Sequence, residues 1–269
     1  MPQIVNDVLQ LFLRWAHVVA GILWIGHLYF FNFVNAHVAK TLDGPTKKAL
    51  VPELMPRALY WFRWGAAWTW FTGILLGGLI YYHGKVVFED PMDQSNNPWL
   101  WLAIVLVILV VGFLIYNAVM KNVKNVLAAN TIVLILFAGV YFFLEFVGKF
   151  SGRSLYIHAG LIFGTMMALN VWMVIWPAQK KIIAATKEGT APDAALVAQA
   201  TLRSRHNTFM SVPLVLTMLV QHLSTMFGNT QHFLGIPIPV RDWCLFGAIA
   251  LGFVVVRLIY GKSAKVSGM

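Results

Sequence analysis

Residues 11–35 read LFLRWAHVVAGILWIGHLYFFNFVN, and this stretch decides the fold class. It is longer than the about 20 apolar residues that a helix needs to cross a bilayer. It nevertheless carries Arg14, His17 and His27. Polar side chains at membrane depth are costly, and they usually face a bundle interior, a cavity or a cofactor. The stretch therefore predicts a transmembrane helix that does more than anchor the chain.

The composition extends this interpretation to the whole chain. Of 269 residues, 59% are hydrophobic and only 11% are charged, which is typical of a polytopic membrane protein. We assign the net charge of +10 to cytoplasmic loops, so the expected partner is the lipid bilayer and no nucleic acid. The single cysteine, Cys244, excludes a disulfide framework and a CxxCH motif for c-type haem.

Hydrophobic segments of sufficient length predict an all-α helical bundle with one transmembrane domain, residues 1–269, and seven spans. Alternate loops are basic, which puts the amino terminus outside and the carboxyl terminus in the cytoplasm. A shift of 141 residues aligns two of the spans, His17 with His158, and suggests a parallel internal repeat. The predicted spans are 11–35, 57–82, 98–120, 127–148, 154–177, 207–227 and 241–260.

Three histidines are predicted to share one level near the outer surface: His17, His158 and His222. A low-spin haem needs two neutral imidazoles from facing helices. We therefore predict haem b, with its iron bound by His17 and His158 and with His222 as the substitute ligand. Arg14 and Arg153 would pair with the propionates. The alternative is that the histidines only form hydrogen bonds that pack the helices.

Two further features leave alternatives open. His27 could serve a second haem with His206, or could form a hydrogen bond in the core. The run RSRHNTFMSVP, residues 203–213, is the most polar segment that touches a span. Arg205, His206 and Asn207 in this run would suit an anionic or heterocyclic ligand. The same run could instead cap and kink the helix.

Three segments resemble the membrane domain of the bacterial urate hydroxylase (urate oxidase amino-terminal domain) family: LRWAHVVAGILWIGH at 13–27, YFFNFVN at 29–35 and SRHNTFMSVP at 204–213. The likeness covers roughly residues 5 to 230. It implies an inner-membrane domain, commonly followed by a c-type cytochrome domain, that oxidises urate to 5-hydroxyisourate and passes the electrons to cytochrome c. The matching polar positions are His17, His27, Arg205, His206 and Asn207.

The chain departs from this pattern because it stops after the seventh span and lacks CxxCH. We therefore expect either a separate cytochrome c or the subunits of a larger respiratory complex as partner. As an enzyme of purine catabolism, the protein would hold the anion with Arg205 and bind or relay protons with His206 and Asn207. The alternatives are a haem b electron-transfer subunit without urate activity, and a transporter or structural subunit without haem.

Overall fold

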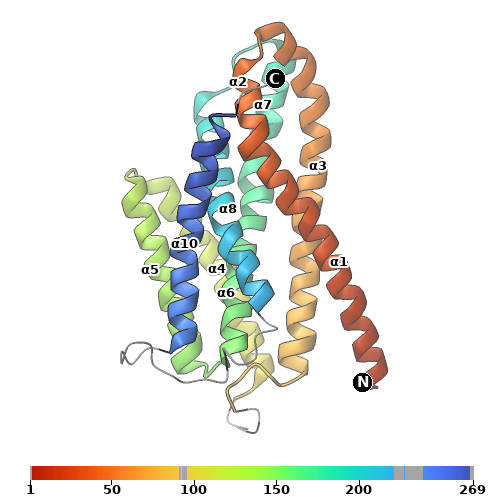
Figure 1. Ribbon diagram of the computed structural model, residues 1–269, viewed down its shortest axis with the longest axis vertical. Helices are drawn as coiled ribbons and strands as arrows, with labels where there is room; N and C mark the ends of the chain where they lie inside the picture. Colours follow the sequence, from red (N-terminus) through yellow and green to blue (C-terminus); the bar gives the residue numbers. More distant parts are fainter. Residues whose placement is uncertain (1, 91, 93–95, 221–226, 228–238, 267–269) are drawn as a thin grey trace. The chain divides into compact units, whose positions relative to one another are not determined.

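The computed structural model describes the whole chain except residues 1, 91, 93–95, 221–226, 228–238 and 267–269. The described residues form seven continuous helical runs and no strand, so the all-α prediction is confirmed (Figure 1). Each predicted span overlaps one run, and residues 221–226 of the predicted span 207–227 lie outside the described residues. In order, with η for a π-helical segment, the runs are α1 (Gln3–Tyr29), η1 (Phe30–Asn35) and α2 (Ala36–Thr41); α3 (Gly44–Gly77) and η2 (Gly78–His83); α4 (Pro98–Asn122); α5 (Val126–Phe142) and η3 (Phe143–Val147); α6 (Gly152–Leu169), η4 (Asn170–Ile175) and α7 (Trp176–Glu188); α8 (Ala194–Leu219); and α10 (Val240–Ser263).

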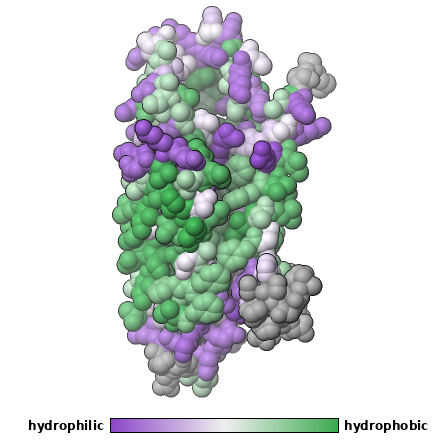
Figure 2. All heavy atoms as spheres, turned by 90° about the vertical axis from the view of Figure 1, so that its left-hand side faces the viewer, coloured by the Kyte–Doolittle hydropathy of each residue, from purple (hydrophilic) through white to green (hydrophobic). Residues whose placement is uncertain are grey.

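The helices have the length and the surface of membrane helices. Five of the described runs are long and apolar enough to cross a bilayer by themselves. Large apolar side chains are exposed along them, such as Leu11, Val107 and Leu251, and Figure 2 shows hydrophobic side chains gathered on one face. Such a surface suits acyl chains rather than water. The protein is therefore a membrane protein. The five runs are Gln3–Thr41, Pro98–Asn122, Val126–Val147, Gly152–Glu188 and Val240–Ser263.

Four of the helical runs extend well beyond the spans predicted within them, since the second begins at Gly44 and α8 begins at Ala194. The first run begins at Gln3 instead of residue 11 and continues to Thr41. The fifth run continues to Glu188, well past residue 177. Hydropathy identifies the segment that suits the hydrocarbon core, whereas a helix can continue into water with polar residues. The first and fifth runs extend through π-helical segments instead of stopping at them.

The π-helical segments support the predicted internal repeat. η4 begins at Asn170, 140 residues after Phe30, where η1 begins. This interval differs by one residue from the shift that aligns His17 with His158. Each segment therefore follows the first helix of its repeat copy at nearly the same position. Single π-helical turns inside α-helices occur frequently at functional sites.

The chain divides into two compact units, each described separately below. Unit 1 consists of Met1–Gly73, Met167–Pro213 and Gly247–Met269. Unit 2 consists of Ile74–Met166 and Leu214–Phe246. The helices α3, α6, α8 and α10 contribute residues to both units. The interpretation of residues 1–269 as one domain stays a prediction.

In unit 1, a glycine brings α1 and α3 into close contact. A Cβ atom at Gly65 would lie 3.0 Å from the backbone nitrogen of Trp24 and 3.2 Å from the carbonyl oxygen of Ala20. Small residues allow membrane helices to approach closely, and packing is what holds them together in lipid. Gly65 therefore sets the distance between α1, which carries His17, and α3, which carries its hydrogen-bond partner Thr72.

In unit 2, a buried ionic network holds the first turn of α10. Arg241 forms an ion pair with Glu145 of η3 at 2.6 Å. The Tyr141 hydroxyl donates to Asp242 at 2.6 Å, and the Tyr156 hydroxyl donates to the Arg241 carbonyl. Charges inside a membrane protein are tolerated when they are paired in this way. The network therefore links α10 to α5, η3 and α6.

Candidate functional site

The most polar part of unit 1 is a set of buried side chains that we call the polar core. In α8, polar residues recur every three or four positions and therefore share one face of the helix. This face meets one asparagine from each of η1 and η4. Every member is at most 7% exposed. The polar core consists of Asn32, Asn170, Arg203, Asn207, Thr208 and Ser211.

Asn207 joins α8 to the run that contains α6 and η4. Its Oδ1 accepts a hydrogen bond from Asn170 Nδ2 at 2.9 Å, and its Nδ2 donates to the Met167 carbonyl at 2.9 Å. Buried polar groups inside a membrane need internal partners because no water is present to replace them. Both ends of the Asn207 amide are thus used to fix the helix position.

Asn32 connects η1 to α8 and α10. Its Nδ2 donates to the Leu28 carbonyl at 2.9 Å and to Ser204 Oγ at 2.8 Å, and its Oδ1 accepts from the Tyr260 hydroxyl at 2.8 Å. The guanidinium of Arg205 lies 5.3 Å from the centre of the Tyr260 ring. Arg205 therefore contacts the edge of the polar core through Tyr260.

The three predicted catalytic residues do not converge on one point. Arg205 is exposed, His206 is half-buried and Asn207 is fully buried. Consecutive residues on an α-helix project about 100° apart, so these side chains leave α8 on different sides. The charged residue on the buried face is Arg203, which is 2% exposed. The catalytic roles of the three residues stay predictions.

Several residues of this site were missed in the sequence: Asn32, Asn170, Tyr260 and the buried position of Arg203. A signal existed for the two asparagines. Each stands in an otherwise apolar stretch, FFNFV and ALNVW. An amide at membrane depth is itself an indication of function or of a packing partner.

His17 has a hydrogen bond that would suit an axial haem ligand. Its Nδ1 lies 3.1 Å from Thr72 Oγ1, and the Thr72 hydroxyl donates to the Trp68 carbonyl at 2.6 Å. Because the hydroxyl has one hydrogen, it accepts from Nδ1–H and leaves a lone pair on Nε2. Metal-binding histidines are usually held by such a bond from the other nitrogen. His17 therefore fits the role of a ligand.

His158, in unit 2, does not fit that role in this arrangement. It is 2% exposed, and its Nδ1 donates to the Ser154 carbonyl at 2.7 Å. Its Nε2 accepts from the Tyr82 hydroxyl at 2.7 Å, and the Phe150 ring centre lies 4.9 Å away. The nitrogen that would bind iron is thus already used. The axial pair of His17 and His158 stays a prediction.

The other predicted haem contacts are spread along the chain. Arg14 is exposed and bonds to Gln10 at 3.3 Å, and Arg153 is exposed on α6. His27 Nδ1 lies 2.7 Å from the Leu23 carbonyl of its own helix. His222 lies outside the described residues. Within the described part of the chain, no group of three His, Cys, Asp or Glu side chains forms a metal site.

The urate oxidase N-terminal family matches residues 3–50 and 44–241. The chain belongs to the urate oxidase N-terminal family. No curated protein and no solved structure matches it. The family match includes His17 and all six residues of the polar core, whereas Tyr260 lies beyond it.

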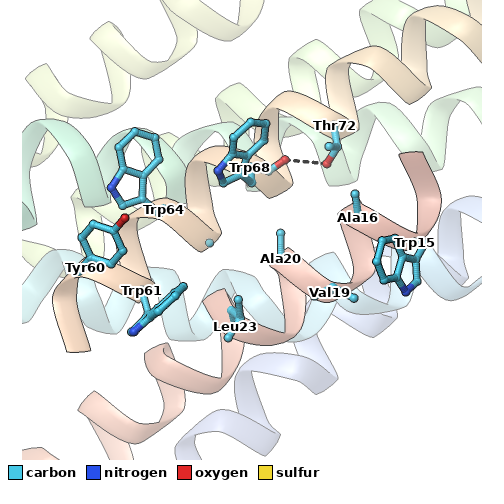
Figure 3. Close-up of a pocket in the computed structure, with 11 residues that line it drawn as sticks. Trp15, Ala16, Val19, Ala20, Leu23, Tyr60, Trp61, Trp64, Trp68 and Thr72 are labelled. Carbon is cyan, nitrogen blue, oxygen red and sulfur yellow. Dashed lines mark hydrogen bonds between the residues drawn. The ribbon is translucent and has the colours of Figure 1, made fainter. Parts of the chain in front are cut away.

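A pocket of about 540 Å³ lies between α1 and α3, also within the family match (Figure 3). Indole rings line much of it, and Thr72, whose hydroxyl holds His17, forms part of the wall. No charged residue is among its lining residues. The pocket therefore suits an apolar group rather than an anion. Its aromatic lining residues are Trp15, Tyr60, Trp61, Trp64 and Trp68.

Proposed function

We propose that the protein is a membrane oxidoreductase that oxidises urate, or a closely similar purine anion, to 5-hydroxyisourate. Membership of the urate oxidase N-terminal family supports this proposal. The buried Arg203 on the polar face of α8 indicates which residues would bind the substrate. A charged side chain inside a membrane protein is a functional-site hypothesis by default. We propose the polar core, rather than the pocket between α1 and α3, as the substrate region.

The polar core has the chemistry that a urate anion needs. Urate is planar and negatively charged, and its edges carry amide-like donors and acceptors. A guanidinium supplies charge-assisted hydrogen bonds, and asparagine amides supply both a donor and an acceptor. Arg203 would hold the charge, and Asn32 and Asn170 lie in the same core. Arg205, next to Tyr260, would attract the anion at the edge.

The reaction balances with water as the source of oxygen. Water adds to C5 of urate, and two electrons and two protons leave to give 5-hydroxyisourate. We propose His206 as the first proton acceptor because a neutral imidazole carries a nitrogen lone pair that can accept a proton. We propose a c-type cytochrome as the electron acceptor.

The alternation of basic loops supports an amino terminus outside the bacterial inner membrane.

A second candidate is a haem b electron-transfer subunit without urate activity. The bond between His17 and Thr72 favours it, because this bond fixes the tautomer that a ligand needs. Bound haem would accept and release single electrons. In that case the polar core would only hold the helices together.

An activity measurement separates the two candidates. The purified full-length chain would be mixed with urate and ferricytochrome c, and both urate loss and cytochrome reduction would be followed. Arg203→Gln should lower kcat/KM by about 10- to 100-fold, because it removes a charge-assisted bond. Arg257→Gln, an exposed arginine on α10, is the matched control and should leave the rate unchanged. Well-folded protein without urate-dependent reduction would contradict the proposal.

A further inference from the structure

Two basic side chains of unit 1 lie against the same indole ring. The Arg63 guanidinium carbon is 4.1 Å from the centre of the Trp176 ring, and Lys180 Nζ is 5.6 Å from it. Arg63 also lies 5.6 Å from the Trp172 ring centre and 5.8 Å from that of Tyr60. Cations are attracted to the faces of aromatic rings within about 6 Å. Trp176 therefore gathers two positive charges at one place.

The backbone holds this arrangement together. The Trp172 indole nitrogen donates to the Arg63 carbonyl at 2.9 Å, which ties η4 to α3 beside the guanidinium. The Trp64 and Trp172 rings meet edge to face at 5.5 Å. Arg63 is thus positioned by its neighbours and is not a loose surface side chain.

The lengths of the two helical runs indicate that the site lies near an edge of the hydrocarbon region. Twenty residues of continuous helix separate Arg63 from His83 at the end of η2, and twenty separate Trp172 from Gly152 at the start of α6. About 20 residues of helix cross the hydrocarbon core. Arg63 and Trp172 therefore both fall where acyl chains meet headgroups, a level at which tryptophan is enriched.

The positive charges lack a protein counter-ion in the described part of the chain. No carboxylate there forms an ion pair with Arg63 or Lys180, and Glu53, earlier on α3, is paired with Arg57 at 2.6 Å. The Nε of Arg63 is buried without a hydrogen-bond partner among the described residues. Two adjacent cations at a bilayer edge are therefore available to an anion from outside the chain.

We propose that Arg63, Lys180 and Trp176 form a binding site for the phosphodiester of an anionic phospholipid. The guanidinium and the ammonium contact the phosphate oxygens, since arginine and lysine both bind phosphate. The tryptophans lie beside the glycerol and the upper acyl chains. A tryptophan belt alone would explain the rings, but it would not place two unpaired cations on one of them.

Native mass spectrometry of the full-length protein tests this proposal without urate. Equal amounts of phosphatidylglycerol and phosphatidylcholine are added, and the ratio of bound lipids is measured. Each basic residue at a membrane surface contributes about fivefold to binding of an anionic lipid. The double variant Arg63→Gln with Lys180→Gln should therefore lower the preference for phosphatidylglycerol by about 25-fold. Lys181→Gln, the neighbouring lysine, should leave it unchanged.

A charge-conserving variant and a competition with inorganic phosphate complete the lipid-binding experiment. Arg63→Lys keeps the charge on the ring, so it should retain most of the preference and show that the fold tolerates substitution. An unchanged lipid ratio in the folded double variant would overturn the proposal. Displacement of phosphatidylglycerol by an equal concentration of inorganic phosphate would overturn the assignment to a lipid.

Discussion

The phenolic oxygen of Tyr82 lies 2.7 Å from Nε2 of His158, at the centre of unit 2. Because the carbonyl of Ser154 can only accept, it fixes the proton of His158 on Nδ1. Tyr82 must then donate to Nε2. Both residues are 2% exposed, so the bond is shielded from water. In this arrangement the imidazole acts as an acceptor that joins α6 to η2.

Tyr82→Phe tests this assignment through stability. The substitution keeps the ring and leaves the buried Nε2 without a donor, which should lower the free energy of unfolding by about 1–3 kcal/mol. Denaturant unfolding in detergent measures it. Tyr60→Phe, on a half-exposed face of unit 1, is the control. Equal stability of the Tyr82→Phe variant and the wild type would show that Nε2 has another partner.

Haem binding should depend on His17 and on the space that Gly73 leaves for it. A Cβ atom at Gly73 would lie 3.0 Å from Cε1 of His17, so Gly73→Ala should displace the imidazole. If the protein binds haem b, His17→Ala abolishes the reduced-minus-oxidised band and Gly73→Ala weakens it. Gly77→Ala, where a Cβ meets nothing within 4 Å, keeps the band. A full band in His17→Ala would exclude His17 as ligand.

The contact of α1 with α3 should be sensitive to one added carbon. Gly65→Ala places a Cβ against the backbone of Trp24, which cannot rotate away. Overpacking of this kind typically costs about 1–3 kcal/mol, measured as a lower free energy of unfolding. Gly26→Ala on α1 meets nothing within 4 Å and should not destabilise the protein. Similar stability of the two variants would contradict the close approach.

Loss of the Asn207 side chain should lower the stability of the fold, whether or not Asn207 takes part in catalysis. Asn207→Ala removes the buried hydrogen bonds to Asn170 Nδ2 and to the Met167 carbonyl, which should lower the free energy of unfolding by about 1–3 kcal/mol. Asn122→Ala removes an exposed bond within α4 and serves as the control. A stable Asn207→Ala variant that has lost only activity would instead place Asn207 in contact with substrate.

The buried ion pair in unit 2 gives a further stability prediction. Arg241→Met leaves Glu145 and Asp242 buried without their cation, which should cost about 3–5 kcal/mol. Arg57→Met breaks an exposed pair with Glu53 and should change the stability little. Unfolding of both variants in parallel tests the difference. Equal effects would mean that the pair in unit 2 is hydrated.

The sequence was sufficient to predict the helices but not their contacts. Length and hydropathy predict all seven runs, because the bilayer sets the length of a spanning helix. The partner of His158 is Tyr82, 76 residues away in the chain. This contact depends on how two helices are rotated and aligned, which hydrophobic pattern alone does not determine. Arg14 shows the same limit, since it bonds to Gln10 on its own helix.

The candidate site was predictable in part for a similar reason. The polar run at 203–213 is visible in the sequence, and its polar residues do lie in the buried core. The sequence did not show which arginine of this run faces the core: Arg203 is buried, whereas Arg205 is exposed. A helix turns 100° per residue, so one position decides which face a side chain takes. The packing partners of α8, among them Asn170 and Met167, define that face.

We propose that the protein oxidises urate with an electron acceptor other than dioxygen. An anaerobic titration with the purified full-length chain tests it most directly. Urate is added in known amounts to protein and excess ferricytochrome c, and the reduced cytochrome is counted. We expect two reduced cytochromes for each urate consumed, with 5-hydroxyisourate as product. No reduction by folded protein, or oxidation that occurs only when dioxygen is admitted, would contradict it.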